Sequence, residues 1–506
     1  MMLDQWPFEY YESLKNIYSE TGIYLFYDID RDEILDEYET RKFENYRLSK
    51  KFFISGSRNT INKIFYDINN NIEIKRPIYY VFNNDKVTIK YSKIKNKNMN
   101  IADEIWLEIS SYLETRDMLN LSFTYNEIYR LLLGDENNMR EHEFTLNPYE
   151  KDLKFVKYLS YKIQNLNLRK NFRIDDESFK YLEGIYKLDM SNHHYDTITD
   201  KAFKYLKGIH TLDISFCNQN TITDTAFKYL QGINTLNMSF CNQNTITDKA
   251  FKYLKGIHTL NMSNCKQETI TDTAFEYLKG IYSLDISGCT QDTITDNAFY
   301  NLKGIYSLNI SHCNQENITD KAFKNLKGIY SLNMSYCNQI TITDNAFKSL
   351  KGIHMLDISH CYQITDYIFQ NLQGINFLYI SGCNQTTITD RAFKNFNNLL
   401  FLDMSGCNQN TITDKAFSYL KSIQVLHMSS CNQLTITDKA LFYLQNISQL
   451  EMPYCNQNTI TDNGLWYLKN LYLLNLDGCC QKTITNKGFN YLKNIPILYS
   501  NCNYFD

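Results

Sequence analysis

The stretch "LDISFCNQNTITDTAFKYLQGINTLNMSFCNQNTITDKAF", from Leu212 to Phe251, carries one pattern twice. Cys217 and Cys241 lie 24 residues apart in nearly identical surroundings. An aspartate follows each cysteine at the same distance, so the repeated pattern is a whole unit of 24 residues and not an isolated motif.

The unit extends over most of the chain. Cysteines recur in 24-residue steps from Cys217 to Cys361 and, after one 22-residue step, from Cys383 to Cys479. The cysteines in this register are Cys217, Cys241, Cys265, Cys289, Cys313, Cys337, Cys361, Cys383, Cys407, Cys431, Cys455 and Cys479. Asn171 and His193 hold the same place in the two earlier units, and Asn503 holds it in the last. The two early units, the twelve cysteine units and the last unit together predict a solenoid of about 15 rungs.

Each unit predicts a strand, a turn and a helix. In "LDIS" the side chains of Leu212 and Ile214 point to one side of a short strand. In "NQNTITD" the polar residues turn the chain, and Thr223 or Asp224 is suited to cap the helix that "TAFKYLQGI" forms. The fold class is therefore α/β: a solenoid over residues 161–506, with parallel strands inside and helices outside.

The regular thiols could form disulfides, bind metal ions, act as nucleophiles or fill a repeating core position. A parallel ladder points all its Cβ atoms the same way, zinc sites need clustered ligands, and a catalytic thiol would be one special cysteine. The alternation with asparagine favours a buried structural ladder beside the backbone of the next coil. Only Cys480 and Cys502 fall outside this register, and we expect them to be the most reactive.

Composition excludes several functions. The formal net charge is −4, which gives no general attraction to nucleic acid or to a membrane surface. No apolar run is long enough to span a bilayer, and the first residues lack a secretory pattern, so a cytoplasmic or nuclear location is expected. No phosphate-binding or dinucleotide motif is present, and no histidine is placed consistently to activate a serine. The sequence therefore predicts no catalytic residue, no metal and no cofactor.

The face lined by the strands changes along the repeats. From the Cys217 unit to the Cys337 unit its outward positions hold Thr or Ser, Asp or Asn, and Ser, which is a small and uniform surface. Later units carry larger side chains, edged by acidic residues such as Glu451. Clustered exposed aromatics are frequent interaction anchors, although neutral divergence of repeats is the alternative. A protein substrate is expected at Met355, Asp357, Phe377, Tyr379, Phe401, Asp403, Val425 and His427.

The units resemble cysteine-containing leucine-rich repeats, with the pattern L-x-x-L-x-L-x-x-N/C. That subfamily is most familiar from F-box proteins. Before the repeats, "NIADEIWLEISSYLETRDMLNLSFTYNEIYRLLL" (Asn100–Leu133) resembles the F-box pattern L-P-x-E-I-L-x-x-I-x-S-Y-L-x-x-x-D-L-x-x-L. Ala102 replaces the usual proline, which removes a preset helix start. The resemblance implies adaptor contacts from Ile101, Glu104, Ile105, Trp106, Ile109, Tyr112, Leu113, Leu119 and Leu121. An ordinary core helix hairpin is the alternative reading.

This resemblance implies the non-catalytic, substrate-recognition subunit of an SCF-type E3 ubiquitin ligase. The F-box would dock on a Skp-type adaptor and through it on a cullin/RING complex, while the repeats bind a protein substrate. The chain also resembles F-box proteins of giant DNA viruses of amoebae, for which the adaptor would belong to the host. A leucine-rich-repeat scaffold without a link to ubiquitination is the alternative. The expected domains are an N-terminal α+β module (1–97), the small helical F-box (98–141), a linker (142–160) and the solenoid (161–506).

Overall fold

The computed structural model describes residues 164–171 and 173–501, together with the backbone of five short strands before them. The chain divides into two units, Met1–Glu150 with Lys154–Leu168, and Lys151–Leu153 with Arg169–Asp506. The early strands are β1 (Ile23–Phe26), β2 (Phe52–Ser55), β3 (Tyr80–Asn83), β4 (Lys86–Ile89) and β5 (Glu143–Thr145).

In the first unit, β1 pairs with β2 in parallel and β3 pairs with β4 in an antiparallel hairpin. Strand β5 pairs in parallel with β6 (Asn165–Asn167). The predicted F-box, residues 98–141, lies outside the described residues, as do the boundaries expected for the linker.

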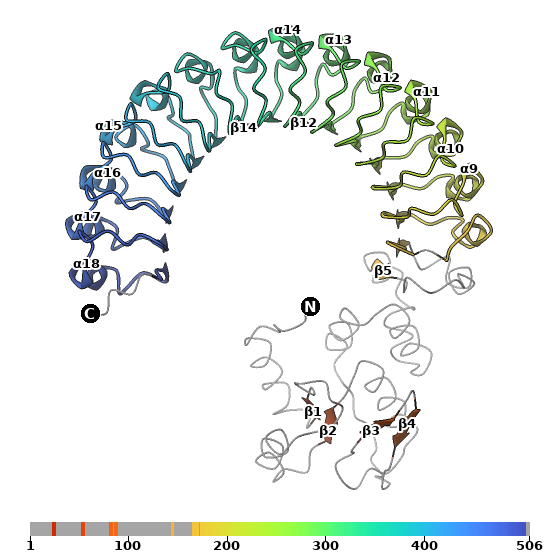
Figure 1. Ribbon diagram of the computed structural model, residues 1–506, viewed down its shortest axis with the longest axis horizontal. Coiled ribbons are helices and arrows are strands. Elements are labelled where there is room, and N and C mark those ends of the chain that lie inside the picture. The colour runs from red at the N-terminus through yellow and green to blue at the C-terminus, as the bar shows by residue number, and fades with distance from the viewer. Residues whose placement is uncertain are drawn as a thin grey trace. The chain divides into compact units, whose positions relative to one another are not determined.

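The second unit is a ladder of consecutive parallel strands (Figure 1). Figure 1 shows this unit as a curved ribbon, with strands along the inner, concave edge and helices along the outer edge. With β6, these strands give the fifteen rungs predicted. The strands are β7 (Lys187–Asp189), β8 (Thr211–Asp213), β9 (Thr235–Asn237), β10 (Thr259–Asn261), β11 (Ser283–Asp285), β12 (Ser307–Asn309), β13 (Ser331–Asn333), β14 (Met355–Asp357), β15 (Phe377–Tyr379), β16 (Phe401–Asp403), β17 (Val425–His427), β18 (Gln449–Glu451), β19 (Leu473–Asn475) and β20 (Ile497–Tyr499).

The outer elements are shorter than ordinary helices, and several coils use 3₁₀ turns because a tighter helix spans the same rise with fewer residues. The α-helices are α9 (Asp200–Phe203), α10 (Asp224–Phe227), α11 (Asp248–Phe251), α12 (Asp272–Glu276), α13 (Asp296–Tyr300), α14 (Asp320–Phe323), α15 (Asp414–Phe417), α16 (Asp438–Tyr443), α17 (Asp462–Tyr467) and α18 (Asn486–Tyr491). The 3₁₀ elements are η2 (Ser178–Tyr181), η3 (Lys204–Leu206), η4 (Lys228–Leu230), η5 (Lys252–Leu254), η6 (Lys324–Leu326), η7 (Ala346–Leu350), η8 (Ile368–Asn371) and η9 (Asp390–Phe393).

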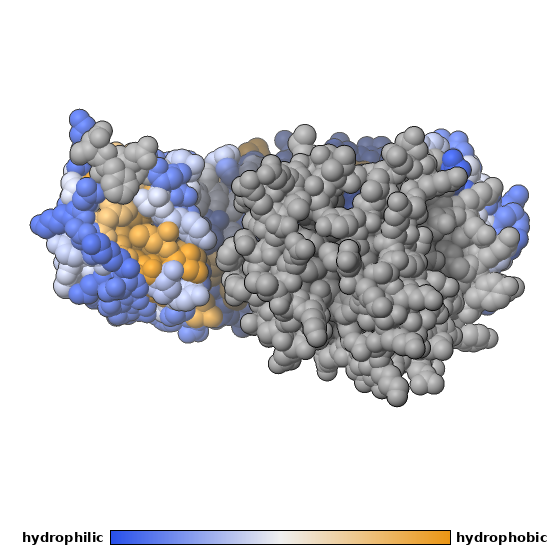
Figure 2. All heavy atoms as spheres, turned by 90° about the horizontal axis from the view of Figure 1, so that it is seen from below, coloured by the Kyte–Doolittle hydropathy of each residue, from blue (hydrophilic) through white to orange (hydrophobic). Residues whose placement is uncertain are grey.

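The core runs between the two edges of the ribbon. In the β8 coil, Leu212 from the strand, Ile214 directly after it and Phe227 from α10 are fully buried. Burying one such side chain stabilises the fold by about 1.5–3 kcal/mol. Leu498, the equivalent of Leu212 in the last coil, is 36% exposed because no later coil covers it among the described residues. Figure 2 shows apolar surface on the end of the unit where this coil lies.

The polar residues of the turn join each coil to its neighbour. Thr221 Oγ1 donates to the carbonyl of Ile198, 2.8 Å away in the preceding coil. Asn218 Oδ1 accepts the backbone N–H of Asn242 in the following coil, at 2.6 Å. In five successive coils a buried or half-buried glutamine donates to the carbonyl of the cysteine in the preceding coil. The motif "CNQNTITD" therefore recurs along the chain because its polar side chains form hydrogen bonds between coils. Leaving a buried polar group without a partner would cost about 1–3 kcal/mol.

The aspartate column has a different role from the helix cap expected for it. Thr223 caps α10 by accepting the N–H of Thr225, at 3.1 Å. Asp200, one coil earlier, accepts both the N–H of Thr223 at 2.8 Å and its hydroxyl at 2.7 Å. The same pair of bonds recurs in the coils from Asp176 to Asp462. The aspartates thus join coil to coil and orient the threonine that caps the next helix.

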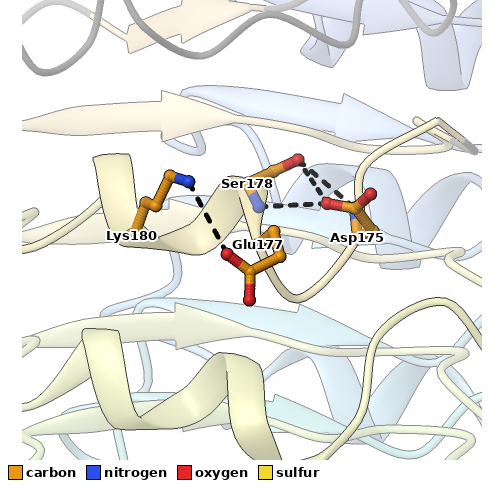
Figure 3. Close-up of polar contacts among 4 residues, drawn as sticks. All are labelled: Asp175, Glu177, Ser178 and Lys180. Carbon is orange, nitrogen blue, oxygen red and sulfur yellow. Dashed lines mark hydrogen bonds and ion pairs between the residues drawn. The ribbon is translucent and has the colours of Figure 1, made fainter.

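The first helical turn of the second unit is capped differently. Asp175 stands where later coils have the capping threonine, and its carboxylate accepts the N–H of Ser178 at 3.0 Å and its hydroxyl at 2.8 Å (Figure 3). Lys180 pairs with Glu177 at 3.6 Å on the same exposed turn. In return, Ser178 Oγ accepts the N–H of Asp175 at 3.5 Å. Such a reciprocal arrangement is like that of a capping box, in which two residues at a helix start satisfy each other's N–H groups.

Candidate functional site

The regular thiols lie in the core. All twelve cysteines of the register are free and buried, and each Sγ lies 3.0–3.4 Å from a carbonyl oxygen of the preceding coil. Burial raises the pKa of Cys217 to about 12 and that of Cys479 to about 11. A thiol that is protonated and inaccessible is neither a nucleophile nor a metal ligand, so the site must be sought on the surface.

The two remaining cysteines call for a correction. Cys480 was expected to react as a free thiol, but it is disulfide-bonded. Cys502 lies outside the described residues. The reason for the error is that register alone reports which thiols stack in the core and not which ones meet a partner at the end of the array.

Two aromatic columns border the concave face, and sequence reasoning missed both. The leading column, which precedes each strand by one residue, stacks the rings of His258, Tyr282, Tyr306, Tyr330 and His354 at 4.5–4.7 Å and 7–19° from parallel. The trailing column, which precedes each cysteine by one residue, stacks Phe216 on Phe240 and His312, Tyr336 and His360 in a row at 4.3–4.4 Å. The signal was present, because side chains at a 24-residue spacing in a parallel register must meet.

The trailing column has an unusual backbone. Its aromatic members have φ between 56° and 60°, the left-handed region that costs a non-glycine residue roughly 1–2 kcal/mol. Ring stacking at each step contributes about 0.5–1.5 kcal/mol in the opposite direction. Both columns are therefore part of the fold, since their rings stack face to face between neighbouring coils.

The predicted substrate residues come together on strands β14 to β17. Met355, Phe377, Phe401 and Val425 are successive partners in one register row. Asp357, Tyr379, Asp403 and His427 form the next row. All eight side chains are half-buried on the concave side, and we call them the concave patch.

Rings in the concave patch do not stack. Tyr379 and Phe401 have centroids 4.9 Å apart and planes tilted by 41°, and Phe377 lies 6.3 Å from Phe401 at 33°. His427 meets Phe401 edge-on at 5.0 Å and lies 3.6 Å from Glu451 of the next strand. The patch thus presents aromatic surface that its own rings do not cover.

Its carboxylates are held by the backbone. Asp357 and Asp403 each accept the N–H of the serine two residues later, at 2.9 Å. Burial raises the pKa of Asp357, and the charge of Asp403 raises it further. Burial also raises the pKa of Tyr379, which lies between these two carboxylates in the register row. The patch is therefore aromatic and negative.

Within residues 164–171 and 173–501 no group of three acidic, histidine or cysteine side chains is arranged to hold a metal ion. In the same part of the chain, no helix has the length and apolar character needed to cross a bilayer. The arrangement supports binding by a surface.

Comparison with known families agrees with the repeat architecture. The BspA type leucine rich repeat region matches in six copies, over residues 154–282, 268–400 and 363–496. The protein belongs to this leucine-rich-repeat family. A comparison with curated proteins finds no match. The family's fold is a non-catalytic repeat scaffold that mediates binding interactions.

Solved structures share this fold at low sequence identity. The structure of a TLR13–ssRNA13 complex is 17% identical with a TM-score of 0.50, and the match covers 72% of this chain and 59% of that one. The glycosylated Toll–Spatzle complex of Drosophila is 14% identical with a TM-score of 0.50, over 70% and 50% of the two chains. An internalin (inlF) of Listeria monocytogenes is 20% identical with a TM-score of 0.46, over 64% and 89%. The first two likenesses, at 17% and 14% identity, show the fold alone, and this chain spans about three-fifths of the TLR13 chain and half of the Toll chain.

Proposed function

We propose that this leucine-rich-repeat protein is the substrate-recognition subunit of an SCF-type E3 ubiquitin ligase. In this proposal the concave patch binds a protein substrate, and the F-box-like segment Asn100–Leu133 docks on a Skp-type adaptor that leads to a cullin/RING complex. The chain itself transfers no group: it raises the local concentration of a substrate lysine near the charged E2.

The observation that carries the binding half is the concave patch. Tyr379 and Phe401 are half-buried but not stacked, which is the condition of anchor residues that still gain burial when a partner arrives. The observation that supports the ubiquitin half is the ordered F-box-like pattern in the sequence, followed directly by repeats. In keeping with the resemblance to giant-virus proteins, the adaptor and cullin are proposed to come from a host, in its cytoplasm or nucleus.

The test is capture of the adaptor by the full chain from a eukaryotic cytosol. Replacing Ile105, Trp106, Ile109 and Leu113 by Ala is expected to abolish co-purification of a Skp-type adaptor, because these residues form the apolar face of the predicted helix. The matched control replaces Phe377, Tyr379 and Phe401 by Ser, which is expected to leave adaptor capture intact.

The alternative function is a protein-binding scaffold outside ubiquitination. It is favoured if the intact chain captures no such adaptor while the concave patch still binds a protein. Unchanged adaptor capture by the quadruple Ala variant would also contradict the proposed docking segment.

A further inference from the structure

The concave patch has uncovered ring faces beside unpaired charge. Tyr379 has aspartates on both sides in its register row, so no ring can stack on it within that row. Phe401 is tilted against it by 41°, which leaves part of each face open. The face of an aromatic ring carries negative potential, which attracts a cation placed over it.

The two carboxylates add to this potential. Asp357 and Asp403 are two strand spacings apart, or about 9.6 Å. Within residues 164–171 and 173–501 neither forms an ion pair. Each accepts the backbone N–H of a serine, which fixes its position without neutralising it. A cation between them would meet two oriented acceptors and an aromatic floor.

The edge of the concave patch is open beside Asp403. The trailing column of rings ends at His360, and its next two members are Gly382 and Gly406. The His360 ring lies against Gly382, where a Cβ atom would collide with it, whereas a Cβ atom at residue 406 would have its nearest neighbour 3.8 Å away. The border is therefore filled by His360 at the β15 coil and free of side chains at the β16 coil, so a side chain can approach the patch beside Phe401 and Asp403.

We propose that the concave patch is a receptor for an arginine side chain of the protein partner, with its guanidinium over the rings of Tyr379 and Phe401 and its N–H groups on the carboxylates of Asp357 and Asp403. The inference rests on the proposed function only in taking the partner to be a protein. Arginine fits better than lysine because its planar cation stacks on a ring and donates to two carboxylates at once. Its apolar stem covers the flanking Met355 and Phe377.

Met355 provides the reporter for a direct test. It is half-buried on the concave patch, whereas Met334 and Met404 in neighbouring coils are 0–1% exposed. The full chain, carrying ¹³C-methyl methionine, is titrated with Nα-acetyl-arginine amide, with its uncharged citrulline analogue and with Nα-acetyl-lysine amide. The Met355 methyl signal is expected to respond to the arginine probe at about tenfold lower concentration than to the citrulline probe. An equal response to citrulline would overturn the proposal, and an equal or stronger response to lysine would overturn the choice of arginine.

A second test of the arginine site uses substitutions that the fold already accepts elsewhere. Asn occupies the aspartate position in other coils and keeps the same bond, as Asn237 does with Ser239 at 3.1 Å. The double variant Asp357→Asn, Asp403→Asn is therefore expected to stay folded and to weaken the arginine response about tenfold. The control, Asp213→Asn with Asp285→Asn, removes the same charge from the early strands, where each aspartate also accepts an asparagine side chain of the next strand. It is expected to leave the arginine response unchanged. Equal weakening by both double variants would assign the effect to net charge and contradict the site.

This outcome is separate from that of the proposed function. The probes need no adaptor, so a failed adaptor capture leaves the arginine result standing. A chain that captures a protein through the concave patch but ignores the arginine probe would refute this inference alone.

Discussion

Between Tyr282 and Tyr330 the rings of the leading column lie 4.5–4.6 Å apart and 7–9° from parallel, whereas Tyr379 and Phe401 in the concave patch lie 4.9 Å apart at 41°. Both sets project from coils with the same core and the same bonds between coils. The difference is one of position. In the leading column every coil offers a ring at the same place, while in the concave patch rings alternate between two register rows.

The comparison shows that the side chains in the adjacent coils decide the role of an aromatic ring on a solenoid. A ring next to other rings stacks on them and stabilises the fold, whereas a ring next to smaller polar residues remains available for binding. In the leading column each ring stacks on its copies in the adjacent coils. A ring flanked by aspartates, as Tyr379 is, has no ring stacked on it in its register row and can contact a bound partner. Four measurements sharpen or break this distinction.

The largest effect is expected from the aspartate–threonine bridges, which the two regions share. Asp248→Ala and Asp390→Ala each remove an acceptor of two hydrogen bonds from the next threonine and are expected to lower the free energy of unfolding by about 3 kcal/mol. Urea denaturation measures this, with the exposed Glu276→Ala on the α12 coil as the control. If the two variants differed by more than about 1 kcal/mol, the scaffold would not be equivalent in both regions.

A smaller effect is expected at His193, which holds the cysteine position in the β7 coil. Burial lowers its pKa from 6.5 to about 4, so the unfolded chain takes up a proton first as pH falls. The stability from neutral His193 is present above pH 6.5 and is lost progressively down to pH 4, amounting to roughly 2 kcal/mol at pH 5. His193→Asn, which copies the preceding coil's Asn171, should reduce this loss. An identical pH dependence of unfolding in the two proteins would contradict the assignment.

The smallest effect is expected at the thiols. Burial raises the pKa of every cysteine in the register, so native protein at pH 8 should show no rapid labelling of these twelve in either region. Mass spectrometry of alkylated peptides measures this, and Cys479 should be the first to react as the pH is raised. Fast labelling of Cys383 or Cys407 without unfolding would show that the coils under the concave patch open more easily than the others.

The sequence predicted the coil well because its signals are periodic. The 24-residue spacing of the cysteines fixed the number of rungs, and the alternation in "LDIS" fixed which strand residues are buried. Thr223 was one of two candidates for the helix cap, and geometry selected it. Asp224 was misassigned because a carboxylate beside a helix start can serve its own coil or the next, and spacing alone does not say which.

The concave patch was predicted as a set of aromatic and acidic residues, but the geometry of their side chains was not. Alternation along a strand places Phe377 and Phe401 on one face, yet it does not report the tilt of their rings or the burial of Asp357. The leading and trailing columns were missed because the alternation of side chains applies only to residues within a strand. Tyr306 and Tyr336 lie outside the strands of their coils. Ring stacking depends on the rise between coils, which is a property of the assembled array.

The most direct test removes the rings of each region in turn. One variant replaces Tyr282, Tyr306 and Tyr330 of the leading column by Ser, and the other replaces Phe377, Tyr379 and Phe401 of the concave patch by Ser. Urea unfolding and the Met355 response to Nα-acetyl-arginine amide are measured on both full-length proteins. The leading-column variant is expected to lose more stability and to keep its response to arginine, while the patch variant loses the response and keeps more of its stability. A patch variant that still responds, or a leading-column variant that keeps full stability and loses the response, would contradict the division between rings that hold the coils together and rings that bind.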